Sequence, residues 1–172
     1  MNTSFLQSSK HFLAVLALGI AISSNSTTAA DEAKAPVGKP LDIQFMAVDG
    51  RSVNVQDLKG RVVLIDFWAT WCGPCVGEVP HVKAAYDKLH EKGFEIVGIS
   101  FDQEKPALEN FVKTKEMAWP QYFDGKGWEN KFGKQFGIQS IPTMWLIDKK
   151  GVLRDVNARG NLEEKVTKLI AE

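Results

Sequence analysis

The stretch "FWATWCGPCVGEVP", residues 67–80, holds both cysteines of this 172-residue chain, Cys72 and Cys75. It overlaps the run "RVVLIDFWA", residues 61–69, whose nearly unbroken apolar character is typical of a strand buried on both faces of a sheet. Pro74 suits the first turn of a helix, where its missing N–H leaves no hydrogen bond unmade. The two cysteines are therefore predicted to lie where a central strand passes into a helix.

This placement predicts different chemistry for the two thiols. Gly73 permits a tight turn, and Cys72 falls at the helix N-terminus, where free backbone N–H groups and the helix dipole favour a negative charge. Cys72 is therefore the expected nucleophile, with an exposed and stabilised thiolate. Cys75 follows one turn later on the same side, more deeply set and close enough to form a bridge. The arrangement predicts a dithiol exchange site.

A purely structural disulfide is the alternative for this pair. A bridge that spans four residues closes almost no loop, and the chain-entropy benefit of a disulfide shrinks with loop length. A domain of this size also buries enough apolar surface to fold without a covalent staple. Reactivity therefore explains the pair better than stability does.

The N-terminus follows the plan of a secretory signal. Lys10 and His11 precede an apolar run at 12–22, and small polar residues at 23–30 lead to Asp31. We expect cleavage before Asp31 and a periplasmic or otherwise extracytoplasmic protein, in which two cysteines pair readily. The alternatives are an uncleaved membrane anchor, although eleven apolar residues fall short of the ~20 that span a bilayer, and an N-terminal helix of the fold.

Three segments are expected: a signal peptide at 1–30, a linker at 31–40 and a single domain at 41–172. The composition, 44% hydrophobic and 24% charged, is ordinary for a globular protein. Twenty-one basic residues balance 21 acidic ones, and loss of the signal with its one lysine leaves a net charge of −1. This near-neutrality argues against a nucleic-acid partner. We expect a monomer.

Strand and helix patterns alternate along the domain, which implies an α/β layered fold with a mixed sheet. The expected elements are a hairpin around residues 49–50, strands at 61–69 and 94–102, a helix from the cysteines to about 92 that Pro80 kinks, an amphipathic helix at 105–117, a short helix near 129–137, a strand hairpin at 142–148 and 151–157, and a last helix at 161–172 with Asn161 as its N-cap.

Several motifs together resemble a known family. "DFWATWCGPC", residues 66–75, resembles the active-site segment of thioredoxin. The export signal, the hairpin, "CGPCVGEVP" at 72–80, an insertion after "VGISFD" at 97–102 and "SIPT" at 140–143 resemble the extracytoplasmic TlpA/ResA-like thiol-disulfide oxidoreductases. The resemblance covers residues 37–172. It implies a thioredoxin-like fold: a central mixed β-sheet flanked by helices, with an N-terminal β-hairpin and a βα insertion before a cis-proline strand.

The resemblance also implies roles for the cysteines. In these families the first cysteine attacks a protein disulfide and the second resolves the mixed disulfide, so the roles fall to Cys72 and Cys75. The redox-active Cys72–Cys75 disulfide serves in place of a cofactor, and no metal is expected.

Two carboxylates are candidate catalytic residues. Asp66 interrupts the apolar run, and a buried carboxylate is unfavourable without a task or a partner. By resemblance Asp66 matches the thioredoxin acid that exchanges protons with the resolving cysteine, although many TlpA-like proteins have Asn there; the alternative is an acid that reaches a basic partner or water. Glu78 matches a glutamate that tunes thiol ionisation in ResA-like members, since a nearby negative charge raises a thiol pKa. Its alternative is an ordinary solvated glutamate.

The candidate substrate-binding residues surround the cysteines. Pro142 matches the proline that thioredoxin-like folds keep in the cis form, where it presents the Ile141 backbone to an extended substrate. Trp71 is expected to form an apolar rim beside the turn at Gly73 and Pro74. Trp68 is most simply a core residue.

Other chemistries fit the sequence less well. A peroxiredoxin has its cysteine in a Pro-x-x-x-Thr-x-x-Cys setting, but Ala69 stands three residues before Cys72. A Sco-like copper chaperone pairs two cysteines with a distant histidine. Here His81 and His90, the histidines after the signal, both fall in the helix that follows the cysteines.

The Gly-Pro pair between the cysteines is shared with reducing thioredoxin, which favours a disulfide reductase for specific exported proteins. By resemblance the clients are apocytochrome c or copper-site assembly proteins, and a CcdA/DsbD-like membrane carrier delivers the electrons. A general oxidant or isomerase is the alternative. Forty residues separate Phe101 from Pro142, and this insertion is expected to add a helix and a short strand that shape partner choice.

Overall fold

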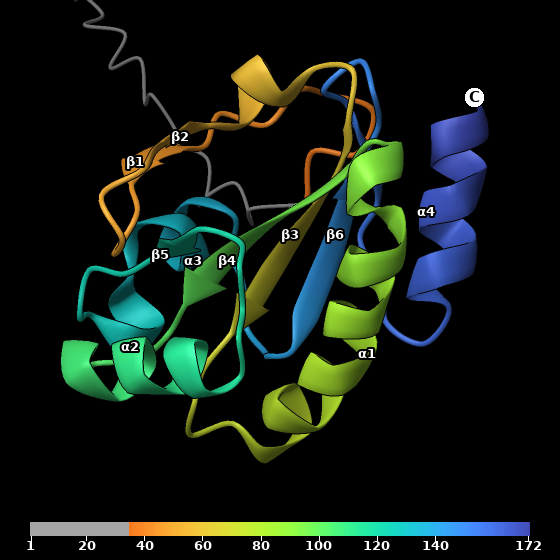
Figure 1. Cartoon of the computed structure of the whole chain (residues 1–172). Helices are drawn as coiled ribbons and strands as arrows, with labels where there is room; N and C mark the ends of the chain where they lie inside the picture. The colour runs from red at the N-terminus through yellow and green to blue at the C-terminus, as the bar shows by residue number, and fades with distance from the viewer. Residues whose placement is uncertain (1–34) are drawn as a thin grey trace, which may run out of the picture. The chain divides into compact units, whose positions relative to one another are not determined.

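The computed structural model describes residues 35–172, and Figure 1 shows how their strands and helices are arranged. A five-stranded sheet with the order β5-β4-β3-β6-β7 forms the centre. The central strand β3 runs parallel to β4 and antiparallel to β6, so the predicted mixed sheet is confirmed. The strands of this sheet are β3 (Val62–Trp68), β4 (Phe94–Ser100), β5 (Gln121–Tyr122), β6 (Thr143–Ile147) and β7 (Leu153–Asp155).

Strand β3 is buried along its whole length, as its apolar sequence predicts. Successive side chains of a strand point to opposite faces of the sheet, and the last two residues of β3 show both faces. The ring of Trp68 packs 5.5 Å from Phe111 of α2 (Lys105–Thr114), whereas Phe67 packs against Phe136, which follows α3 (Lys131–Gln135). Helices α2 and α3 therefore cover opposite faces of the sheet.

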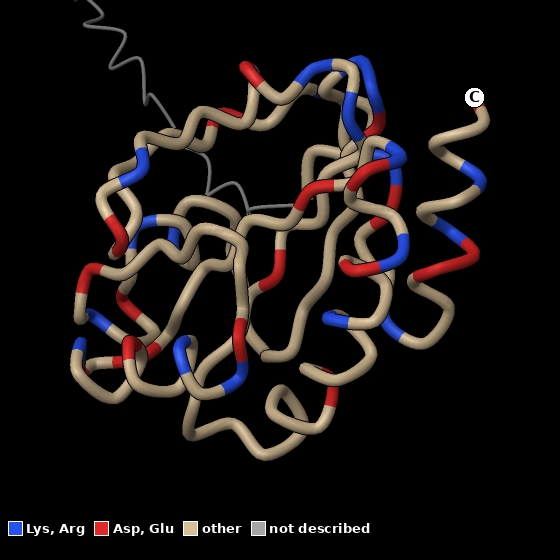
Figure 2. Tube along the Cα trace, in the orientation of Figure 1, with Lys and Arg blue, Asp and Glu red and all other residues tan. Residues whose placement is uncertain are grey.

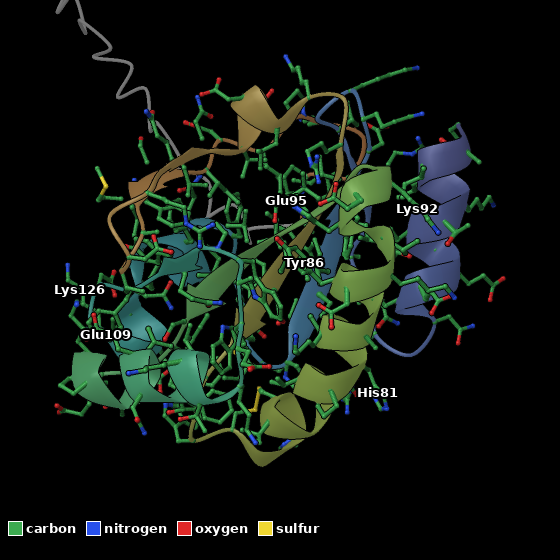
Figure 3. All side chains as sticks on the ribbon, viewed as in Figure 1. His81, Tyr86, Lys92, Glu95, Glu109 and Lys126 are labelled. Atoms are coloured by element: carbon green, nitrogen blue, oxygen red, sulfur yellow. A yellow bond between two sulfur atoms is a disulfide. The ribbon has the colours of Figure 1, made fainter. Side chains whose placement is uncertain are left out.

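Helix α1 (Gly73–Leu89) begins directly after the β3 loop and continues as a 3-10 turn, η2 (His90–Lys92). Pro80 lies inside α1 without ending it. Figure 1 shows α1 beside α4 (Leu162–Ala171), and Figure 3 shows Tyr86 of α1 and Glu95 of β4 between the helix and the sheet. The predicted last helix is confirmed, although the side chain of Asn161 makes no capping hydrogen bond.

The predicted N-terminal hairpin is also confirmed. Strands β1 (Gln44–Met46) and β2 (Ser52–Asn54) pair antiparallel around Gly50, whose φ of +86° is the left-handed region that favours glycine. The hairpin is continued by a 3-10 turn, η1 (Val55–Leu58), and is tied to the sheet where Val48 N–H donates to the Gln121 carbonyl at 3.0 Å.

Part of the expected linker belongs to the folded domain. Gly38 N–H donates to the Leu153 carbonyl at 2.8 Å, and Pro40 forms a bridge with Val152. The packed chain thus begins before residue 41. The expected signal peptide at 1–30 lies outside the described residues. From residue 35 onward, no helix combines the length and the apolar character needed to cross a bilayer.

Charged residues of both signs are interspersed along most of the chain in Figure 2. Two longer stretches are exceptions, because they carry no Lys, Arg, Asp or Glu. They are residues 67–77, from the end of β3 into the first turn of α1, and residues 135–147, from the end of α3 through β6. The surface around the cysteines is therefore built mainly from uncharged groups.

Candidate active site

The cysteine pair lies where the sequence predicts, at the passage from β3 into α1. Cys72 is the N-cap residue of the helix, and its Sγ accepts the Cys75 N–H at 3.2 Å. The two sulfurs are bonded, with Cα atoms 5.2 Å apart. In the reduced protein we expect this N–H and the helix dipole to favour a thiolate at Cys72.

One expectation about the cysteines is wrong for the disulfide form. Cys72 is only 6% exposed, hardly more than Cys75 at 3%, so the first cysteine is not an exposed residue. The Ile141 carbonyl oxygen lies 3.8 Å from Cys72 Sγ and covers one side of it. Gly73 and Pro74, which follow Cys72, are exposed.

The segment opposite the cysteines has the predicted geometry. The Ile141–Pro142 peptide bond is cis, as the resemblance implies. Strand β6 begins at the next residue, and its antiparallel pairing with β3 places Thr143 opposite Phe67. The two strands therefore bring Ile141 to Cys72 although 69 positions separate them in the sequence.

Asp66 is buried in β3, opposite Met144 of β6, and is 5% exposed. Its Oδ1 atom has no hydrogen-bond partner among residues 35–172. Burial, with a smaller contribution from the negative charge of Glu78, raises the pKa of Asp66 to about 7. The alternative of an acid satisfied by a basic partner is not what the structure shows. The exchange of a proton between Asp66 and the resolving cysteine stays a prediction.

Glu78 differs from both interpretations of the sequence in one respect: it has a specific partner. The Nε of Arg159, from the loop between β7 and α4, donates to Glu78 Oε1 at 2.8 Å. The Glu78 side chain is only 18% exposed, so it is not an ordinary solvated residue. The hydrogen bond from Arg159 lowers the pKa of Glu78, despite the opposing effect of burial.

His81 makes the second, weaker contact of Glu78, with its Nδ1 3.5 Å from Oε2. Figure 3 shows His81 on the side of α1 away from the sheet, and its side chain is 78% exposed. His81 is therefore a surface residue. The pKa of Glu78 is thus lowered, whereas that of Asp66 is raised, in part by the negative charge of Glu78. Of these two carboxyl groups, Asp66 is therefore the one that holds a proton near neutral pH.

Asp102 is a supporting residue that sequence reasoning missed. It is 2% exposed at the end of β4. Its carboxylate accepts the Thr70 N–H at 3.2 Å, the Thr70 hydroxyl at 2.5 Å and the Ser100 hydroxyl at 2.8 Å. These bonds fix the loop that leads into Cys72. The available signal was an acid at the end of the apolar segment "FEIVGISFD", residues 94–102.

The predicted apolar rim is present and larger than expected. Trp71 is 55% exposed, and its ring lies 6.3 Å from that of Trp128, which is 44% exposed and comes from the 3-10 turn η3 (Gly127–Glu129) in the insertion. Trp68 is a core residue, as expected, and its indole N–H donates to Gln121 Oε1 at 3.0 Å. Sequence reasoning missed Trp128 and Arg159; nothing in a single sequence connects Arg159 with Glu78, 81 positions away.

A bonded Cys-x-x-Cys pair that caps a helix and faces a cis-proline, in a mixed sheet flanked by helices, defines a thiol-disulfide oxidoreductase of thioredoxin-like fold. Residues 29–170 match the Redoxin family, and the chain belongs to this family.

Its relatives agree with that class. The chain is 36% identical over 144 residues to the thiol-disulfide oxidoreductase ResA of Bacillus thuringiensis subsp. konkukian, which covers 80% of this chain and 81% of the relative. ResA of Halalkalibacterium halodurans is 30% identical, with 90% and 86% covered. Among solved structures, the thioredoxin domain of a Bacteroides vulgatus thiol-disulfide oxidoreductase is similar with a TM-score of 0.70 and 28% identity, covering 78% of this chain and 97% of that one. The chain is thus a ResA-like protein-disulfide oxidoreductase.

Proposed function

We propose that this protein works as a reductase: the Cys72–Cys75 dithiol reduces disulfides in specific exported proteins. In the forward reaction the Cys72 thiolate attacks one sulfur of a client disulfide, and the other client sulfur leaves as a thiolate. Cys75 then attacks Cys72 Sγ, which releases the second client thiol and forms the Cys72–Cys75 disulfide. Two electrons and two protons pass to the client. Asp66 is the proposed acceptor of the Cys75 proton.

The observation that carries this direction is the charge around the dithiol. Strongly oxidising dithiol proteins owe their potential to a stabilised reduced form. Here the helix N-terminus favours a thiolate at Cys72. The carboxylate of Glu78, however, follows Cys75 by one turn of the same helix, and Arg159 is engaged by it. Negative charge disfavours the thiolate and so opposes a strongly oxidising potential.

The clients and the electron donor belong to the same proposal. An exported reductase of this kind needs electrons from a membrane carrier, for which a CcdA/DsbD-like protein is proposed. The proposed clients are apocytochrome c before haem attachment or proteins that assemble copper sites. The apolar segment at 12–22 supports an extracytoplasmic location, reached through a signal peptide or an uncleaved anchor.

A redox titration of the full-length protein against glutathione or dithiothreitol tests the direction. A reductase should have a midpoint near that of thioredoxin, about −270 mV. A midpoint near −150 mV, between DsbA and protein disulfide isomerase, would instead assign the protein as a general oxidant or isomerase. The titration needs no knowledge of the natural client.

A further inference from the structure

Two exposed tryptophans lie together beside the cysteines. Of the five large hydrophobic side chains that are exposed in residues 35–172, only Trp71 and Trp128 contact each other as rings, with centroids 6.3 Å apart. Trp71 is the residue before Cys72, whereas Trp128 comes from the insertion, 57 positions after Trp71. Large aromatic side chains left in solvent next to a reactive group mark an interaction site more often than single scattered ones do.

The orientation of both rings is fixed by one buried residue, Phe101, which directly follows β4. The Trp71 indole N–H donates to the Phe101 carbonyl at 3.3 Å. The Phe101 ring, fully buried, packs edge-to-face against Trp128 at 5.1 Å. The two indoles therefore form a preorganised surface, and binding against it requires little further ordering of side chains.

The segment that carries Trp128 is held by its own network. Asp124 accepts the backbone N–H groups of Lys126 and Lys131, each at 3.0 Å. Asn130, fully buried, donates to the Gly127 carbonyl at 2.7 Å and accepts the Gly133 N–H at 2.7 Å. These bonds build a rigid turn around Trp128, although the ring itself remains 44% exposed.

We propose that Trp128, together with Trp71, binds an aromatic side chain of the client close to the cysteine under attack, and so determines which disulfides are reduced. This inference rests on the proposed function. Any client in a mixed disulfide with Cys72 must cover the surface next to Trp71, so the tryptophan pair is continuous with the exchange site.

The spacing suits a nearby client residue. An extended chain rises about 3.3 Å per residue and repeats its side-chain direction every two residues. A residue two positions from the client cysteine thus lies about 7 Å from it, on the same side. Because residues 67–77 are uncharged, the surface offers such a segment apolar contact rather than ion pairs. Aromatic pairs contribute about a threefold to tenfold change in affinity beyond their buried area.

The test compares two symmetric peptide disulfides with the full-length, reduced protein. One peptide carries tryptophan two residues before and after its cysteine, and the other carries serine there. 2-Hydroxyethyl disulfide serves as a substrate too small to reach Trp128. Rates are measured as released thiol by chromatography, for the wild type, Trp128→Ala and Trp128→Phe, with Met46→Ala as the control for loss of an exposed apolar side chain elsewhere.

We expect the wild type to reduce the tryptophan peptide about threefold to tenfold faster than the serine peptide. Trp128→Ala should remove this preference, Trp128→Phe should restore most of it, and Met46→Ala should leave it intact. Rates with 2-hydroxyethyl disulfide should be the same for all variants. An equal loss on all three substrates, or an unchanged preference in Trp128→Ala, would overturn the inference.

A binding measurement keeps this result separate from the redox direction. The oxidised protein is titrated by NMR with the same peptides carrying serine in place of cysteine. If the proposed reductase function fails, tighter binding of the tryptophan peptide that is lost in Trp128→Ala would still support the docking site. Equal binding of both peptides by the wild type would contradict it.

Discussion

A buried carboxyl group without a partner is unfavourable in its charged form, and Asp66 is such a group. Its Oδ1 lacks a hydrogen-bond partner among the described residues, and its pKa is raised to about 7. The folded protein therefore keeps a proton that the unfolded chain releases at its ordinary pKa of 3.8. Between these two pH values the folded state binds more protons than the unfolded state, so Asp66 makes the free energy of unfolding decrease as the pH rises.

The substitution Asp66→Asn should remove this pH dependence. The free energy of unfolding of the oxidised variant should exceed that of the wild type by little at pH 4. The difference should grow up to pH 7 and stay constant above it. Each tenfold change in ionisation corresponds to 1.36 kcal/mol, so the full gain is ~4 kcal/mol. Urea unfolding of the oxidised proteins from pH 4 to 8 measures it, because the bonded cysteines do not titrate.

The exposed acid Asp57 provides the matched control for this experiment. Asp57→Asn should change the free energy of unfolding little, since the Asp57 side chain is exposed to solvent. A stability difference between wild type and Asp66→Asn that does not vary with pH would show that Asp66 is ionised in the folded protein.

The Glu78–Arg159 pair should set the ionisation of Cys72 in the reduced protein. Removing the carboxylate with Glu78→Gln should lower the thiol pKa, whereas Arg159→Gln leaves that carboxylate unpaired and should raise it. Partly exposed pairs contribute up to about 1 kcal/mol. At pH 7 the rate of alkylation by iodoacetamide should therefore rise about threefold to fivefold in Glu78→Gln and fall by a similar factor in Arg159→Gln.

The double variant Glu78→Gln/Arg159→Gln should alkylate at a rate between those of the two single variants. Lys83→Gln, which removes a cation paired with Asp87 on the same helix, should leave the rate unchanged. If both single variants changed the rate in the same direction, the pair would support the structure of the helix rather than the charge at the thiol.

At the scale of elements, the contact between β4 and β5 supports the strand that carries the site. Gly98 of β4 faces Gln121 of β5, and a Cβ added at Gly98 would lie 1.9 Å from Gln121 Oε1. That oxygen accepts the buried Trp68 N–H. The side chain of Gln121 is fully enclosed, so it cannot move aside without breaking this bond.

Gly98→Ala should therefore destabilise the protein by ~2 kcal/mol, the usual effect of leaving a buried polar group unpaired. Gln121→Ala leaves the Trp68 N–H unpaired and should have a similar effect. Because both changes break the same contact, the double variant should lose ~1 kcal/mol less stability than the sum of the losses in the two single variants. Urea unfolding measures all three.

Gly77 gives the opposite result by the same substitution and so serves as the control. It is exposed inside α1 with no atom within 4 Å of an added Cβ. Gly77→Ala should stabilise the protein by ~0.5–1 kcal/mol, since alanine is the better helix former. Strictly additive losses for Gly98→Ala and Gln121→Ala would show that Gln121 is not the group displaced.

Local patterns predicted the elements well because each signal is contained in a short window. The apolar run of β3 and the Gly-Pro turn at Cys72 locate the dithiol without any long-range information. Contacts between distant segments were not accessible in this way. The partner of Glu78 comes from a loop 81 positions later, and the rim residue Trp128 comes from an insertion without a recognisable motif.

At the scale of the whole molecule, the family resemblance supplied what local patterns lacked. The cis form of the Ile141–Pro142 bond and its position opposite Cys72 follow from the resemblance rather than from any property of the segment "SIPT". The burial of Cys72 was predicted wrongly because its position at a helix N-terminus says nothing about Ile141, which covers it from the segment before β6. The attachment of residues 38–40 to β7 was missed for the same reason.

The redox direction has a consequence for the stability of the whole fold. Oxidation and unfolding form a thermodynamic cycle. The difference in unfolding free energy between the oxidised and reduced proteins is therefore set by the difference between the redox potentials of the dithiol in the unfolded and in the folded chain. If the folded protein is a reductant, its potential is more negative than that of the unfolded chain, and folding must then favour the disulfide. Each 30 mV of difference corresponds to ~1.4 kcal/mol.

We therefore expect the oxidised protein to be more stable than the reduced protein by ~1–3 kcal/mol, a difference of a few tens of millivolts. Urea unfolding with and without dithiothreitol measures this, and a peptide of residues 70–77 supplies the potential of the unfolded dithiol. Carboxyl groups that disfavour the thiolate add to what the bridge gives by closing its short loop, because they act only in the folded, reduced protein. The Glu78→Gln substitution should make the stability difference between the oxidised and reduced proteins smaller. A reduced form more stable than the oxidised form would require a dithiol that folding drives open, and the protein would then donate disulfides to its clients instead of removing them.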